Sequence, residues 1–205
     1  MRRCIPSSDH SQNQHEFVVH VSHVTYYFHS IQFHEVSVPI GCCSRMASAF
    51  DLSVEMAVPA SRLWKALKQF HEVFPHLAPG TGDTMETVEG KAGQPGSITL
   101  ITFGGVKGAP DGAYAKEKLI SLDDEAMTLS SSEVAGGHLV LGFTKWGSST
   151  KLTPIGDKKV RLEIRVEYEG DGGPVCDMAV EQAKEGMPQM FRAVEAYLLS
   201  NRLFC

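Results

Sequence analysis

The chain has 205 residues, 42% of them hydrophobic and 21% charged, and this composition suits one folded domain with a sizeable core plus an extension. The formal net charge of −5, without a cluster of Lys and Arg, argues against a nucleic-acid surface. The five cysteines show neither a disulfide framework nor the paired spacing of a zinc site, which fits a reducing compartment. We therefore predict no metal, no cofactor and no nucleic-acid partner.

Membrane and secretion signals are missing from the sequence. No apolar run approaches the roughly 20 residues that a membrane span requires, and the N-terminus has no compact apolar core followed by a small-residue cleavage site. We expect no membrane partner and a cytoplasmic protein, with the nucleus left open as a second location. We expect a monomer or a weak dimer, although the sequence does not determine the oligomeric state.

Residues 1–45 differ in kind from the rest of the chain. They hold six of the nine histidines, at irregular spacings of three to six and without cysteine partners, so a metal site there is a weak interpretation. A transit peptide is also weakly supported, because arginines are offset by acidic residues. Met46-Ala47-Ser48 resembles an ordinary start immediately before the first strand. We predict that 1–45 is a poorly ordered N-terminal extension and that 46–205 is the domain.

The domain begins with a predicted strand and two short helices. Alternating apolar residues indicate a strand over 49–58, which Pro59 ends. Helical spacing follows over 60–69, and a second short helix over 72–77 is expected to be interrupted at Pro75. Two short helices against one end of a sheet could support the floor of a cavity.

Six further strands are separated by short turns. Period-two alternation and turn residues place them at 84–89, 97–103, 113–122, 126–134, 138–150 and 159–168. The glycine-rich loop 90–96 contains Gly90, Gly93 and Gly96. A phosphate cradle would need a helix after such a loop, whereas a strand follows, so we predict a hairpin loop.

The chain ends in a long amphipathic segment from Pro174 to about Arg202. Its apolar residues recur in steps of three and four, which predicts a helix with one covered face, bent at Gly186 and Pro188. The order of strand, two helices, six strands and a long helix predicts one α+β domain whose antiparallel sheet curls around the last helix.

Five motifs resemble a known family. The segments 58–66, 74–75, 88–90, 136–137 and 191–199 are similar, in the same order, to the plant family of the major birch-pollen allergen. That family includes pathogenesis-related class 10 proteins, major latex proteins and norcoclaurine synthases. The similarity extends from about Phe50 to Asn201 and covers none of the N-terminal segment.

The resemblance implies a helix-grip fold of the START-like type, with a seven-stranded antiparallel sheet around the C-terminal helix and a large apolar cavity. It implies an intracellular, defence-related carrier of a hydrophobic or amphipathic plant metabolite, such as a hormone, flavonoid, sterol or alkaloid-like compound. The glycine loop departs from the usual family pattern by one extra residue and a different glycine spacing.

Glu117 is the candidate catalytic residue. By resemblance it matches the carboxylate that acts as general acid and base in the norcoclaurine synthases, and a cavity-facing carboxylate between apolar residues would have a raised pKa. The alternative function is therefore a lyase or cyclase. The synthases' lysine, aspartate and tyrosine fall at Leu129, Ser148 and Ala115 here. Glu117 could instead orient a ligand, or pair with Lys116 or Lys118.

The cavity wall is predicted from the alternation along the strands, the helix pattern and the resemblance. Trp146 is a candidate flat surface for a ring-shaped ligand, His138 could polarise a ligand carbonyl, and Glu133 is expected at an exposed strand end. The same apolar side chains could also pack the interior shut. The expected lining is Leu67, Phe74, Ile101, Phe103, Tyr114, Leu129, Ser131, His138, Val140, Gly142, Thr144, Trp146, Ser148, Ala183, Gly186, Met187 and Met190.

A second alternative function is hormone-dependent inhibition of a protein phosphatase, as in the related abscisic-acid receptors. Those proteins carry a Ser-Gly-Leu-Pro-Ala gate and a His-Arg-Leu latch. This chain has Gly108-Ala109-Pro110 and Gly137-His138-Leu139 at the corresponding places. The differences make this function the weaker one.

Overall fold

The computed structural model describes residues 46–77, 83–103, 112–201 and 204. The predictions made for 1–45 and for the gate-like segment 108–110 lie outside the described residues. The described segments contain seven strands, three α-helices and one 3-10 helix. Their bounds are β1 (Met46–Met56), α1 (Ala60–Lys68), α2 (Phe70–Leu77), β2 (Thr84–Glu89), β3 (Ile98–Thr102), β4 (Tyr114–Asp123), β5 (Thr128–Gly136), η2 (Gly137–Leu141), β6 (Phe143–Gly156), β7 (Lys159–Gly170) and α3 (Pro174–Ser200).

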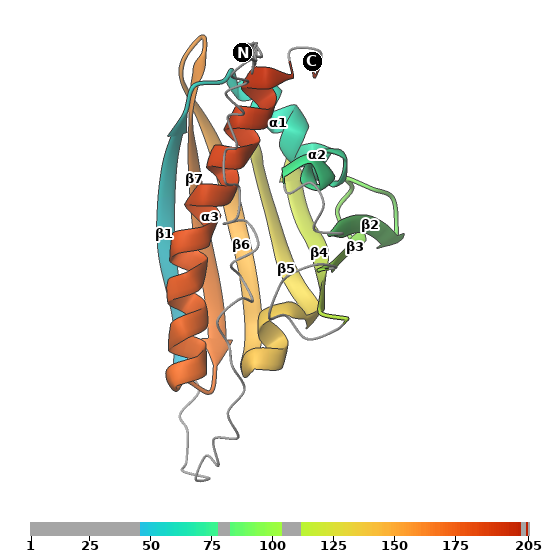
Figure 1. Cartoon of the computed structure of the whole chain (residues 1–205), viewed down its shortest axis with the longest axis vertical. Coiled ribbons are helices and arrows are strands. Elements are labelled where there is room, and N and C mark those ends of the chain that lie inside the picture. The colour runs from blue at the N-terminus through green and yellow to red at the C-terminus, as the bar shows by residue number, and fades with distance from the viewer. Residues whose placement is uncertain (1–45, 78–82, 104–111, 202–203, 205) are drawn as a thin grey trace, which may run out of the picture.

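The seven strands form one antiparallel sheet in the order β1-β7-β6-β5-β4-β3-β2. Neighbours in sequence pair as hairpins from β2 to β7, and β1 closes the order by pairing with β7. The sheet bends around α3, which runs along its inner side in front of β1 and β7, while α1 and α2 lie beside the upper part of α3 (Figure 1). The predicted α+β helix-grip class is confirmed.

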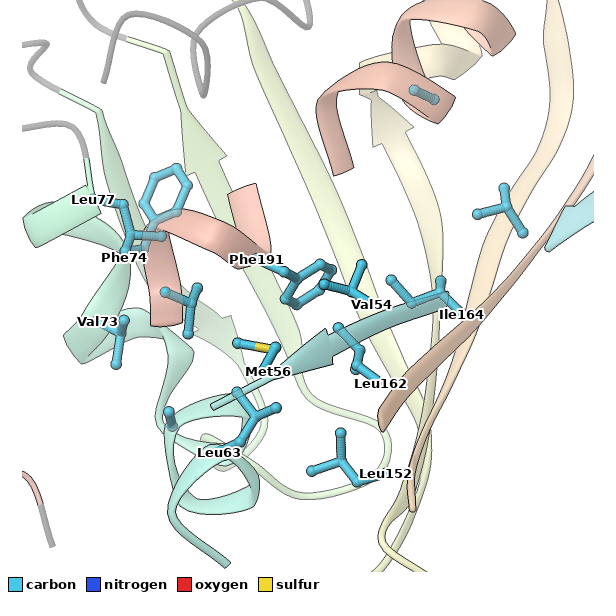
Figure 2. Packing of buried hydrophobic residues seen from close by; sticks show 14 of the residues in the cluster. Val54, Met56, Leu63, Val73, Phe74, Leu77, Leu152, Leu162, Ile164 and Phe191 are labelled. Carbon is cyan, nitrogen blue, oxygen red and sulfur yellow. The ribbon is translucent and has the colours of Figure 1, made fainter. Parts of the chain in front are cut away.

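The core lies between α3, the two short helices and the β1–β7 side of the sheet. Side chains from these elements point toward one common interior in Figure 2, among them Met56, Leu63, Val73, Leu162 and Phe191. Burial of each such side chain contributes about 1.5–3 kcal/mol to stability. Buried side chains therefore fill most of the interior on the β1–β7 side of the domain.

Two local expectations about the helices change in the structure. The second helix begins at Phe70 and continues through Pro75 to Leu77, so the predicted interruption is wrong. In a helix of eight residues, Pro75 removes a single i→i−4 hydrogen bond, which the packing of Val73, Phe74 and Leu77 into the core can offset.

The predicted strand over 138–150 is also different. Residues Gly137–Leu141 form the 3-10 helix η2, and β6 begins only at Phe143. Gly136, Gly137 and Gly142 all have positive φ angles, which residues with side chains rarely adopt, and they turn the chain into and out of η2. The three glycines therefore end the strand pattern that simple alternation predicts.

The C-terminal half of α3 is fastened to the end of β1. The carboxylate of Glu195 accepts a hydrogen bond from the backbone N–H of Ala57 and is 2.8 Å from Nη1 of Arg192. The same Nη1 donates to the carbonyl oxygen of Glu55 at 2.7 Å. These contacts hold α3 against one edge of the sheet, away from β3 and β4.

Candidate functional site

A cavity of about 320 Å³ lies between α3, the two short helices and strands β2 to β7. Its lining is contributed by elements far apart in the sequence. The lining residues are Leu67, Lys68, Phe70, His71, Phe74, Asp83, Met85, Thr87, Gly93, Ser97, Thr99, Ile101, Phe103, Ala115, Glu117, Leu119, Leu122, Leu129, Ser131, Glu133, Gly137, His138, Trp146, Ser148, Thr150, Ile164, Met187, Met190 and Phe191.

Most of the wall residues expected from the sequence lie around this cavity. They come from both short helices, the glycine-rich loop, strands β3 to β6 with the residue after β3, η2 and α3. Those that line it are Glu117, Leu67, Phe74, Ile101, Phe103, Leu129, Ser131, His138, Trp146, Ser148, Met187 and Met190, together with Gly93 of the glycine loop. Gly90 and Gly96 of the loop do not line it.

Tyr114 does not line the cavity, and strand geometry gives the reason. Side chains alternate between the two faces of a strand, so Tyr114 and Glu117, three positions apart, point to opposite faces. Ala115 is buried on the cavity side, whereas Tyr114 is 41% exposed. The same rule separates Glu117 from Lys116 and Lys118. The alternative of an ion pair with either lysine is therefore wrong, because none joins them among the described residues.

Val140, Gly142 and Thr144 also do not line the cavity. Val140 belongs to η2 instead of a strand and is 67% exposed. Gly142 is the left-handed residue that ends η2. Thr144 is exposed because the register between β6 and β7 shifts from Phe143 to Lys145, and this irregularity breaks the alternation that would have placed Thr144 beside Trp146.

Ala183 and Gly186 of α3 do not line the cavity, although they share the apolar stripe of the helix with Met187 and Met190. Both are buried in the packed part of the domain. The cavity-facing side of the helix is formed by Met187, Met190 and Phe191. The small residues at 183 and 186 allow close packing of α3. They do not provide the space of the cavity, which is lined by other residues.

Glu117 projects into the cavity from the middle of β4. It is half-buried, because its carboxyl group faces the cavity instead of bulk water. Among the described residues, none donates a hydrogen bond to this carboxyl group. Burial and, after it, the negative charge of Glu133 raise the pKa of Glu117 to about 7. Near neutral pH this group can give or accept a proton.

Glu133 is buried, contrary to the expectation from the sequence. An exposed strand end was expected, but the strand continues to Gly136 and η2 folds over it, so the Glu133 side chain is only 5% exposed. One carboxylate oxygen lies 2.7 Å from Nδ1 of His138, and the other accepts the backbone N–H of His138 at 2.7 Å. The period-two alternation of Leu129, Ser131 and Glu133 indicates the same inward face for all three residues, which agrees with this position.

His138 covers one face of Trp146. Their ring centroids are 3.6 Å apart and the planes differ by 5°, and Phe143 meets both rings edge-on. Tyr168 stacks on Trp146 at 5.6 Å. Trp146 therefore does not offer the free flat surface that was expected, because the imidazole of His138 covers one face of its ring. Of this aromatic cluster, His138 and Trp146 line the cavity.

The cavity also contains the positions at which the synthases carry further chemical groups. Leu129, Ser148 and Ala115 all line it, yet none supplies an amine, a carboxylate or a phenol. The hydroxyl oxygens of Ser131 and Ser148 lie 3.3 Å apart on the same wall. The arrangement can hold polar groups of a small molecule and exchange a proton at Glu117, but it lacks a lysine for a Schiff base at this position.

The described residues contain no group of three or more His, Cys, Asp or Glu side chains placed to bind a metal ion. None of the helices in the described segments combines the length and the apolar character needed to cross a bilayer.

A curled antiparallel sheet, a long helix held in it and a partly apolar cavity between them define the helix-grip class of fold. Residues 46–201 match the Pathogenesis-related protein Bet v 1 family, and the chain belongs to this family. The resemblance stated from the motifs is confirmed.

Individual relatives include both allergens and enzymes. The chain is 33% identical to Major strawberry allergen Fra a 1-A of Fragaria ananassa over 144 residues, which cover 69% of this chain and 87% of that protein. It is 27% identical to Norbelladine synthase of Narcissus pseudonarcissus, covering 62% and 77%. A norcoclaurine synthase of Thalictrum flavum, solved with dopamine and hydroxybenzaldehyde, has a TM-score of 0.62 at 23% identity, covering 82% and 97%, and shares the fold.

Proposed function

We propose that this protein binds a hydrophobic or amphipathic plant metabolite in the cavity and acts as its carrier. The observation that supports the proposal is the cavity itself, which has apolar walls and a few polar side chains that converge on it. A volume of about 320 Å³ falls at the lower end of the range typical of small-molecule sites. Family membership agrees with this function without naming a ligand.

The polar groups make an amphipathic ligand a better fit than a hydrocarbon. Glu117, Ser131 and Ser148 face the same space as Ile101 and Met190. Buried polar groups left without hydrogen bonds cost stability, so a ligand that supplies matching polar atoms is favoured. Native mass spectrometry of protein purified from its own tissue would identify a retained molecule and the true N-terminus together.

Binding can be tested with a neutral fluorescent probe, N-phenyl-1-naphthylamine, and its displacement by candidate metabolites. Leu129→Trp places a large ring in the cavity wall and should weaken probe binding by about tenfold or more. Ile120→Trp is the matched control, because Ile120 lies on the outer face of β4 and is 52% exposed. Equal probe binding by the folded Leu129→Trp protein and the control would contradict the cavity as the binding site.

A second candidate function is proton-transfer catalysis on the bound molecule. It is supported by Glu117, whose pKa of about 7 suits a general acid or base at neutral pH. Incubation of a metabolite extract in D₂O should then introduce deuterium at a carbon position, detected by mass spectrometry. Glu117→Gln should abolish this incorporation. Unchanged incorporation in the variant would remove Glu117 from any mechanism.

A phosphatase-inhibitor function has less support. The segment corresponding to the gate lies outside the described residues, and the segment corresponding to the latch, in η2, is tied inward by the contact of His138 with Glu133. A binding assay with a protein phosphatase and added hormone would test it directly.

A further inference from the structure

Two carboxyl groups face each other across neighbouring strands inside the cavity. Glu117 of β4 and Glu133 of β5 are direct cross-strand partners, and both line the cavity. Directly opposite residues in an antiparallel pair have Cβ atoms about 4.5–5.5 Å apart, where like charges destabilise the sheet. The pair is therefore more stable when only one of the two carboxyl groups is charged.

The surroundings decide which of the two carries the charge. Both oxygens of Glu133 are engaged by His138, at 2.7 Å to Nδ1 and at 2.7 Å from the backbone N–H. Hydrogen bonds donated to a carboxylate favour its charged form. Gly137 makes the backbone contact possible, because its φ is +53° and a Cβ there would lie 2.5 Å from a Glu133 oxygen. The backbone at Gly137 and His138 thus packs closely against the carboxyl group of Glu133.

Glu117 has no comparable support. Its other cross-strand partner is Thr99 of β3, and no described residue donates a hydrogen bond to its carboxyl group. The remaining titratable residues of the cavity wall are Lys68, His71 and Asp83, and Lys68 is paired with Asp124 at 2.6 Å.

The part of α3 that lines the cavity adds only Met187, Met190 and Phe191. Within the described wall, the long helix therefore brings no positive charge to Glu117. We propose that Glu133, held as a carboxylate by His138, keeps a proton on Glu117 up to about neutral pH, so that the cavity presents a hydrogen-bond donor to an acceptor oxygen of its ligand. The ligand part of this inference rests on the proposed binding function.

The ligand class that follows is an amphipathic molecule with an uncharged acceptor oxygen, such as a carbonyl, placed against Glu117. Glu133 is then a positioning residue, since it acts on the ligand through the protonation of Glu117. The raised pKa of Glu117 has the direction that this arrangement requires. Raising the pH above neutrality ionises Glu117 and replaces the donor by a charge that repels an acceptor oxygen.

The protonation part is tested without any ligand. Side-chain carboxyl signals of the full chain labelled with ¹³C-glutamate are followed by NMR across the pH range, and Glu117→Gln assigns the Glu117 signal. Glu133→Gln should lower the titration midpoint of Glu117 by about one pH unit. Glu86→Gln, the same chemical change on the exposed outer face of β2, should leave it unchanged. An unchanged midpoint in folded Glu133→Gln overturns the inference.

If the Glu133→Gln protein does not fold, a second measurement on the wild-type chain tests the same inference. In the wild-type chain, the ¹⁵N signals of the His138 ring should shift as Glu117 titrates, because Glu133 contacts the ring and faces Glu117. This shift should disappear in Glu117→Gln. A His138 ring that does not respond to the titration of Glu117 overturns the inference.

The ligand part is tested with 2-acetylnaphthalene and 2-ethylnaphthalene, which differ by a carbonyl oxygen. Near pH 6 the ketone should bind about fivefold more tightly, the value of one hydrogen bond, and the preference should vanish well above neutrality. Equal binding of the two near pH 6 overturns the assigned ligand class and leaves the binding function standing. Binding of neither, with the Glu117 midpoint still shifted by Glu133→Gln, rejects the binding function and leaves the protonation result standing.

Discussion

At the scale of single residues, the cavity depends on a few positions that other amino acids cannot replace. Gly137 is one of them, because it combines a positive φ with the close approach of the Glu133 carboxylate. Gly172 has a similar positive φ of +73°, but a Cβ there would meet nothing within 4 Å. Substitution at Gly172 would therefore cost backbone strain alone, whereas substitution at Gly137 would cost backbone strain and a steric clash.

Gly137→Ala should destabilise the protein more than Gly172→Ala. Backbone strain costs about 1–2 kcal/mol at either position, and only at Gly137 must the buried carboxylate also move. Chemical denaturation measures both changes in the free energy of unfolding. Equal losses in the two variants would show that the Glu133–His138 contact does not require glycine.

Glu117 should make stability depend on pH in a defined direction. Its folded pKa of about 7 lies above the ordinary value of 4.5, so between these values the unfolded chain loses its proton first. The contribution of Glu117 therefore becomes less favourable as the pH rises from about 4.5 to about 7, by at most about 3 kcal/mol, and is constant above. Denaturation of wild-type and Glu117→Gln proteins across this range measures it. A difference between the two that does not vary with pH would contradict the shifted pKa.

At the scale of elements, the position of α3 decides where the interior is solid and where it is hollow. The helix packs against the β1 side of the sheet, and the space opposite β3 and β4 is left as the cavity. Glu195 and Arg192 fasten this arrangement to the end of β1. The polar contacts at one end of the helix thus help to preserve the hollow region beside it.

Glu195→Ala should lower the free energy of unfolding by about 1–3 kcal/mol. The substitution leaves the backbone N–H of Ala57 without its acceptor and Arg192 without its carboxylate. Glu185→Ala on the exposed side of the same helix removes an equal charge and should change stability by less than about 0.5 kcal/mol. Similar losses in both variants would mean that net charge, and not the contact with β1, is responsible.

At the scale of the whole molecule, an open cavity in a marginally stable domain makes stability sensitive to a bound ligand. A ligand that binds only the folded state stabilises it by about 2.7 kcal/mol at a hundred times its dissociation constant. A metabolite recovered with the native protein should therefore raise the unfolding temperature of the wild-type chain. The same metabolite should have no effect on Leu129→Trp, whose cavity is filled, and an equal increase in that variant would place the ligand elsewhere.

Much of the fold could be predicted from periodicity. The alternation along β7 and the apolar stripe of α3 gave element types and approximate bounds, because each buried face repeats at the period of its element. The site was predicted in part. Ile101, Leu129 and Ser148 line the cavity as alternation indicates, whereas Tyr114 and Thr144 do not. Thr144 is displaced by the register shift between β6 and β7, and Tyr114 lies on the face of β4 opposite to Glu117. Composition reveals neither of these features.

The amino-acid pattern alone determined the class of the fold and the family, because these follow from local periods and short motifs, and the family resemblance singled out Glu117. Only the tertiary structure decided that Glu133 is buried, that His138 engages both of its carboxylate oxygens and that Trp146 is covered. These facts depend on strand pairing and on the fold of η2 over the end of β5. Contacts between residues distant in the chain are set by register and packing, which no local repeat of the sequence encodes.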